Sequence, residues 1–101
     1  MIEVQFFIPV ADNDGVKFGD VHHIAFEGFA LEVAGGITLN PATATGSWIG
    51  DKRYDDELRI YSVAIASITE GDKIARIAAF AKAHYRQEAL FLRYLGIAEI
   101  L

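Results

Sequence analysis

Two periodicities of apolar residues alternate along this chain, and their order limits the folds that it can adopt. Residues 2–9 alternate apolar and polar side chains at their start and end at a proline, which is typical of a strand with one buried face. Residues 20–34 instead place apolar side chains three and four positions apart, which predicts a helix from Asp20 to the pair Gly35-Gly36. The predicted buried stripe of that helix consists of His22, Phe26, Phe29, Ala30 and Val33.

The rest of the chain repeats this alternation. The predicted elements are strands at 37–39 with 43–49, at 54–68 and at 89–95, and a helix from Thr69 or Asp72 to Tyr85. Asn40-Pro41 interrupts the first of these strands, which indicates an edge position or a bulge. The resulting order predicts a ferredoxin-like βαββαβ fold of the α+β class, with an antiparallel four-stranded sheet and two helices on one face. At 101 residues, the chain is expected to form a single domain, residues 1–101.

Composition disfavours several classes of function. Cysteine is absent, so disulfides, thiolate metal sites and cysteine nucleophiles are excluded. With 14 acidic and 9 basic residues, and no basic cluster, nucleic acid is not an expected partner. No apolar run reaches the roughly 18 residues of a membrane span, and the start lacks the pattern of a signal peptide, so no membrane association and a cytoplasmic location are expected.

In the predicted fold, the first and third strands lie centrally and one face of the sheet carries no helices. The side chains expected on that uncovered face are Glu3, Gln5 and Phe7, then Arg59, Tyr61, Val63 and Ile65, then Phe91, Arg93 and Leu95. Such a mixture of apolar and charged side chains usually marks an interface. A homodimer through the sheet face is the favoured prediction, with Phe7, Arg59, Tyr61, Phe91 and Arg93 as its contacts. A ligand cavity between two such sheets is the alternative.

Four short motifs carry a family resemblance. They are Gly36-Ile37-Thr38, Gly46-Ser47-Trp48, Glu57 at the start of a strand, and Tyr85-Arg86-Gln87-Glu88-Ala89-Leu90. Together they resemble a family of small bacterial proteins catalogued as a domain of unknown function. Ser47 stands where that family more often has glutamine. The resemblance implies a ferredoxin-like fold and no established activity.

One set of polar and aromatic residues is a candidate ligand-binding site. It comprises Trp48, Tyr54, Glu57 and Gln87. A carboxylate, an amide and two aromatic rings can orient and stack a small polar or aromatic ligand. The alternative is structural, with Glu57 bonded to loop amides and Trp48 closing one end of the core.

The histidines are weaker candidates. His22 and His23 begin a predicted helix, where neighbouring side chains point about 100° apart and do not form a joint metal site. His22 is expected to be packed and hydrogen-bonded, and it is also a candidate ligand-binding residue. His22 and His84 would form a two-histidine site only if the fold brings them close together. Residues 12–15 predict a surface turn, since the rest of a calcium loop is missing. No metal and no cofactor are predicted.

Three classes of function stay open. The favoured one is an uncharacterised dimeric module that binds a small ligand. The second is a cofactor-free enzyme of the dimeric α/β-barrel type, with His22, Glu57 or Tyr61 as the base. The third is an RNA-binding sheet on which Phe7, Tyr61 and Phe91 stack bases. Hydrolases with a G-x-S-x-G motif and nucleotide triphosphatases with a G-x-x-x-x-G-K motif are disfavoured, because both motifs are absent.

Overall fold

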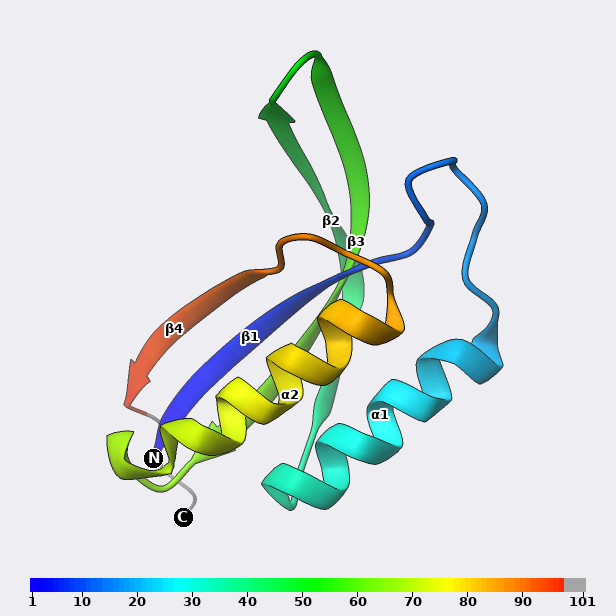
Figure 1. The fold of residues 1–101 in the computed structure, drawn as a ribbon. Helices are drawn as coiled ribbons and strands as arrows, with labels where there is room; N and C mark the ends of the chain where they lie inside the picture. The colour runs from blue at the N-terminus through cyan, green and yellow to red at the C-terminus, as the bar shows by residue number, and fades with distance from the viewer. Residues whose placement is uncertain (98–101) are drawn as a thin grey trace.

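A computed structural model describes residues 1–97 of the protein, apart from the side chains of Trp48 and Ile97. Its elements are β1 (Ile2–Pro9), α1 (Asp20–Ala34), β2 (Thr38–Ile49), β3 (Arg53–Ile65), the 3-10 turn η1 (Ile68–Glu70), α2 (Gly71–His84) and β4 (Phe91–Ile97). The strand order is β2-β3-β1-β4, and all neighbouring strands are antiparallel. Both helices lie on the same face of the sheet (Figure 1). The predicted ferredoxin-like βαββαβ fold is therefore confirmed.

The core lies between this sheet and the two helices. Its fully buried side chains include Val4, Phe6 and Ile8 on β1, Tyr61, Val63 and Ile65 on β3, Phe26 and Ala30 on α1, and Ile74, Ile77 and Ala81 on α2. Burial of these apolar surfaces supplies most of the folding free energy, at roughly 25 cal/mol for each Å² removed from water. Tyr85, the residue that follows α2, is also fully buried and closes one end of the core.

The strand boundaries differ in part from the prediction. β2 is a single edge strand, and its register shifts between Leu39 and Thr43, so both features expected of Asn40-Pro41 are present. β3 ends at Ile65, because the Ser67 side chain accepts a hydrogen bond from the Thr69 N–H and caps η1. β4 begins at Phe91 rather than at 89, because residues 85–90 are used to turn the chain away from α2.

The face of β3 that packs against the helices is the opposite of the one expected. Tyr61 and Val63 pair with Phe6 and Val4, and their side chains are buried beneath the helices. The predicted placement of Arg59, Tyr61, Val63 and Ile65 on the uncovered face is therefore wrong. The physical reason is that β3 carries apolar residues on both faces, so the alternation alone does not show which face meets the helices.

Polar contacts with α1 fix this orientation of β3. The Tyr61 hydroxyl donates a hydrogen bond to Glu27 Oε2 at 2.6 Å, and the Arg59 guanidinium lies 3.9 Å from the same oxygen. Leu58 and Ile60 instead lie on the uncovered face, where Ile60 pairs with Phe7.

Phe7, Phe91 and Arg93 do lie on the uncovered face. The rings of Phe7 and Phe91 pack edge to face with centroids 5.0 Å apart, and the Arg93 guanidinium lies 5.2 Å from the Phe7 ring. We name these three residues the β1–β4 cluster. Phe7 is almost fully buried within it, whereas the Phe91 side chain is 58% exposed.

The phase of α1 also differs from the prediction at its start. The buried residue of the first turn is His23, while His22 is half-buried. Val21, Ile24 and Leu31 are exposed, so α1 carries apolar side chains on all its faces. The sequence periodicity that would mark the buried face is therefore weak. The helix ends at Gly35, which has a left-handed φ of 80° and donates its N–H to the Leu31 carbonyl at 2.8 Å.

Replacing Gly35 with alanine should destabilise the fold by about 1 kcal/mol, because a side chain disfavours the left-handed conformation. Gly36 is the matched control, since its φ lies outside the left-handed region and a Cβ there meets no atom within 4 Å. Urea denaturation of both variants measures the difference. Equal losses for Gly35→Ala and Gly36→Ala would contradict this assignment of the helix end.

Candidate ligand-binding groove

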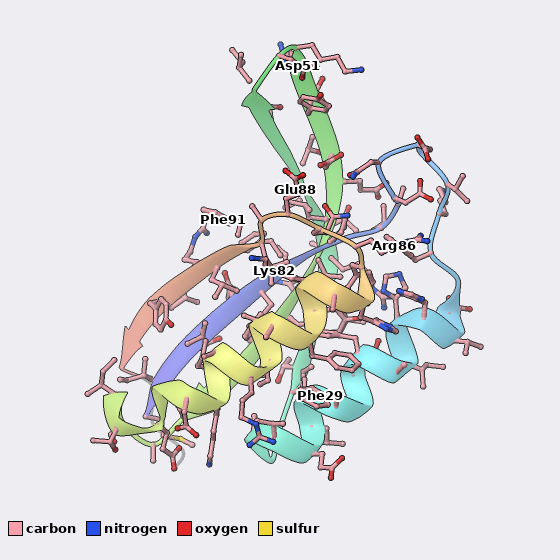
Figure 2. All side chains as sticks on the ribbon, viewed as in Figure 1. Phe29, Asp51, Lys82, Arg86, Glu88 and Phe91 are labelled. Carbon is pink, nitrogen blue, oxygen red and sulfur yellow. The ribbon has the colours of Figure 1, made fainter. Side chains whose placement is uncertain are left out.

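A groove opens where three segments far apart in the sequence meet. Its volume is about 880 Å³, and we name it the polar groove. Its walls are residues 10–17 between β1 and α1, residues 52–57 of the β2–β3 hairpin, and residues 87–89 between α2 and β4. Figure 2 shows Glu88 on the last of these segments, at the base of the projecting hairpin that carries Asp51 at its tip.

Three of the predicted ligand-binding residues line this groove: Tyr54, Glu57 and Gln87. They come from two separate segments, so only the fold brings Gln87 to the other two. The Trp48 backbone pairs with Tyr54 in the β2–β3 ladder, but the Trp48 side chain lies outside the part that the structure describes. His22 is not among the lining residues and lies in the contact between α1 and α2.

The loop wall of the groove is held by Asp12. Its Oδ1 accepts hydrogen bonds from the N–H groups of Asp14 and Val16, each at 2.9 Å, and Gly15 adopts a φ of 81°. The predicted turn at residues 12–15 is therefore confirmed. The Asp12 carboxylate also lies 3.7 Å from the Arg86 guanidinium, which connects this loop to the end of α2. Figure 2 places Arg86 between the two segments.

The hairpin wall contributes two basic residues followed by three acidic ones, Lys52-Arg53 and Asp55-Asp56-Glu57. Arg53 Nε donates to Asp55 at 3.0 Å, and the Ser47 hydroxyl donates to the same carboxylate oxygen at 2.7 Å. The Tyr54 hydroxyl donates to Asp51, which raises the pKa of Tyr54. Asp55 is thus already engaged within the hairpin.

Glu57 is attached to β1 through its main chain. The Val10 N–H donates to the Glu57 carbonyl at 3.1 Å. Among the side chains that the structure describes, none donates a hydrogen bond to the Glu57 carboxylate. The carboxylate is exposed at the groove wall.

A second, smaller hollow adjoins the polar groove on the uncovered face of the sheet. We name it the apolar slot; its volume is about 300 Å³ and it is lined by Phe7, Pro9, Asp56, Leu58, Gln87, Ala89, Leu90 and Phe91. Three of these residues, Asp56, Gln87 and Ala89, also line the polar groove. The two hollows therefore adjoin at Asp56 and Gln87.

Asp56 and Gln87 differ in their surroundings: the pKa of Asp56 is shifted, whereas Gln87 is held by hydrogen bonds. Burial and, to a smaller extent, the neighbouring Asp55 carboxylate raise the pKa of Asp56. Gln87 is fixed at both its main chain and its side chain: its N–H donates to the Lys82 carbonyl and its Nε2 donates to the Tyr85 carbonyl, both at 2.9 Å. The amide oxygen of Gln87 is left as a hydrogen-bond acceptor.

The close approach of His22 to His84 that the sequence left open does occur. The two rings stack with centroids 3.7 Å apart, and each Nε2 lies 2.7 Å from the main-chain carbonyl of the other residue. A carbonyl only accepts, so Nε2 of each ring carries a proton and donates. Phe18 stacks on His22 and Phe80 stacks on His84. This pair fastens the start of α1 to the end of α2.

Sequence reasoning gave no role to His23, which is the buried member of the first pair. Its Nδ1 lies 2.7 Å from the Tyr85 hydroxyl. Burial, followed by the positive charge of Arg59, lowers the pKa of His23, while Glu27 acts in the opposite direction. The one feature of the sequence that could have indicated a buried His23 was its position beside His22, at the start of a helix with apolar residues on all its faces.

Tyr61 has no access to the polar groove or the apolar slot. It is fully buried, and desolvation and its hydrogen bond to Glu27 raise its pKa far above the ordinary value of 10.0. Its hydroxyl therefore stays protonated beneath the helices. Tyr61 is excluded both as a base and as a stacking platform on the sheet surface.

The lowered pKa of His23 makes stability depend on pH. Above its ordinary value of 6.5, His23 is neutral in both states; below it, the unfolded chain binds the proton before the folded chain does. The free energy of unfolding should therefore fall as the pH drops from 6.5 to the lower pKa of the folded state. Urea denaturation at several pH values measures this decline.

His23→Gln should flatten the decline over that interval, although its overall stability will be lower because the bond to Tyr85 is disturbed. Glu32→Gln is the control, since it removes an ionisable side chain that is exposed on the same helix. An unchanged slope in His23→Gln would show that another group causes the pH dependence.

Comparison with known proteins identifies the fold only. No family model matches the chain, and no curated protein does. The chain is similar to a solved structure, a crystal structure of a point mutant of CutA1 from Pyrococcus horikoshii OT3, with a TM-score of 0.59 and 14% sequence identity. The alignment covers 100% of this chain and 87% of that chain. The resemblance to a family of unknown function stays a prediction.

Two further observations describe residues 1–97. Neither helix has the length and apolar composition needed to cross a membrane. Within the same residues, no group of three or more histidine, aspartate and glutamate side chains is arranged to hold a metal ion.

Proposed function

We propose that this protein is a binding module for a small ligand, and that its site is the polar groove together with the apolar slot. The observation that carries this proposal is the position of Asp56 and Gln87, which line both hollows. Ligand sites typically combine an apolar cavity with a few polar groups that set orientation. A ligand spanning the two hollows would meet apolar side chains at one end and carboxylates at the other.

Tyr54, Glu57 and Gln87 are the ligand-binding residues in this proposal. All three line the polar groove, and Gln87 is held in place by its own hydrogen bonds before any ligand arrives. Such pre-organisation lowers the entropic cost of binding. Trp48 stays a predicted contributor through its place opposite Tyr54 in the ladder.

The proposal can be tested by nitrogen-15 NMR of the full chain with a panel of small aromatic and polar metabolites. We expect ligands to shift the amide signals of residues 54–57 and 87–89 together. Glu57→Gln should weaken binding and leave the free energy of unfolding within about 0.5 kcal/mol, because its carboxylate supports no buried group. Glu32→Gln, on the exposed face of α1, should leave binding unchanged. A panel that shifts none of these amides would overturn the proposal.

We also propose that the protein self-associates through the uncovered sheet face. Phe91 exposes 58% of its side chain there and, with Phe7, forms one wall of the apolar slot. A second copy on this face would cover the slot, so dimerisation and ligand enclosure would support each other. The contacts in this proposal are Phe7, Phe91 and Arg93, because Arg59 and Tyr61 lie under the helices.

One alternative function loses support, and the other is narrowed to a single candidate base, Glu57. The RNA-binding sheet required Tyr61 as a surface aromatic, and that ring is buried. The cofactor-free enzyme required His22, Glu57 or Tyr61 as a base. Of these, Glu57 lines the polar groove, while His22 stacks with His84 and Tyr61 is buried.

Phe91→Asp should weaken self-association by about 2 kcal/mol or more, as expected for a central aromatic contact. Ile24→Asp is the matched control, because Ile24 has a similar exposed fraction of 62% but lies on α1. Sedimentation velocity over a range of concentrations measures both. A wild-type protein that stays monomeric at about 100 μM, or a control that dissociates equally, would contradict the sheet-face interface.

A further inference from the structure

We propose that the ligand is a cationic amine with an aromatic or comparably apolar body, bound with its ammonium group between Asp56 and Gln87 and its body in the apolar slot. This inference rests on the proposed ligand-binding function and names the chemical class of the ligand.

The apolar slot has a single charged position among the residues that the structure describes there. Asp56 occupies that position, and Phe7, Leu58 and Phe91 line the wall beside it. Gln87 is the other polar lining residue, with its Nε2 already donating to the Tyr85 carbonyl. Asp56 contributes acceptor oxygens, and Gln87 contributes an amide oxygen that accepts, along with the second N–H of its Nε2. A ligand end that donates several hydrogen bonds satisfies both of them.

The electrostatic state of Asp56 favours a positive charge beside it. Burial and the nearby Asp55 carboxylate both penalise its ionised form. An ammonium group in contact would remove part of that penalty and form a charge-assisted hydrogen bond. An anionic ligand end in the same place would add a second negative charge next to Asp56.

Three basic residues near the site lie outside the slot, and a fourth, Arg93, packs over the Phe7 and Phe91 rings without being among the described lining residues. Lys17, Lys52 and Arg53 line the polar groove but are absent from the described lining of the slot. Arg53 is hydrogen-bonded to Asp55, and the Lys52 ammonium lies 5.3 Å from the centre of the Tyr54 ring. The formal charge of −5 for the chain adds a general attraction for cations.

The size of the slot suits a body of one ring. A volume of about 300 Å³ is at the lower end for ligand pockets. The Phe7 and Phe91 rings form one wall, and the Arg93 guanidinium lies 5.2 Å from the first and 5.9 Å from the second. A flat apolar group can pack against these rings while its amine reaches Asp56.

Three matched probes test this inference on the full chain: 2-phenylethylamine, 2-phenylethanol and 3-phenylpropionate. They share a phenyl ring on a short chain and differ in the charge of the end group. Dissociation constants come from NMR titration at neutral pH, followed through the amide signals of residues 56–58 and 87–91. We expect the amine to bind at least about tenfold more tightly than the alcohol, and the carboxylate to bind most weakly.

Two variants locate the charge effect. Asp56→Asn should reduce the affinity for the amine about tenfold and leave the affinity for the alcohol nearly unchanged. Asp55→Asn removes the same charge one residue earlier, outside the described lining of the slot, and should change the affinity for the amine much less. Equal losses in both variants would indicate general charge attraction and would overturn the assignment to Asp56.

The remaining outcomes separate this inference from the proposed function. Preferential binding of the alcohol or the carboxylate at the same amides would overturn the amine assignment and retain the groove as a ligand site. Absence of binding by all three probes would overturn the amine assignment. Absence of binding by both the probes and the metabolite panel would overturn the proposed function as well.

Discussion

The buried aromatic residue Tyr85 and the histidines around it hold the end of α2 against the start of α1. Tyr85 is fully buried, its hydroxyl lies 2.7 Å from His23 Nδ1, and the rings of His22 and His84 stack beside it. The next residue, Arg86, adopts a left-handed φ of 54°, which is costly for a residue with a side chain. Its ion pair with Asp12 and its position over the Phe18 ring, 5.8 Å from the centroid, accompany that conformation. The polar groove depends on this arrangement, because Gln87 follows directly and Asp12 belongs to the opposite wall.

The groove and the slot place a charged environment beside an apolar one. The β1–α1 loop and the hairpin supply charged side chains, whereas the uncovered face of the sheet supplies Phe7, Leu58 and Phe91. Asp56 lies at the boundary because β3 passes from the exposed hairpin into the sheet at this point. Its raised pKa is a direct result of that position, since one side of the carboxylate is desolvated. The acid-rich site and the acidic chain are consistent with a cationic ligand.

Much of the fold was predictable from residue pattern. The alternation at the start of β1, the helix end at Gly35, the edge or bulge signal at Asn40-Pro41, and the spacing in α2 indicated the order of the elements and the ferredoxin-like sheet. The candidate site was partly predictable: Tyr54, Glu57 and Gln87 were expected to meet, and they line one groove. Asp56 was missed, because the sequence shows an acidic run at 55–57 without showing which carboxylate faces an apolar surface.

The sequence alone settled which segments are strands and helices, because periodicity and turn residues are local properties of the chain. Only the tertiary structure decided the faces. Arg59 and Tyr61 turned toward the helices because Glu27 on α1 offers them a carboxylate, and both faces of β3 are apolar enough to be buried. His23 rather than His22 is buried for the related reason that Tyr85, the residue that follows α2, provides its hydrogen-bond partner. Which side chains are buried therefore depends on partners that are distant in sequence, and a local residue pattern cannot predict it.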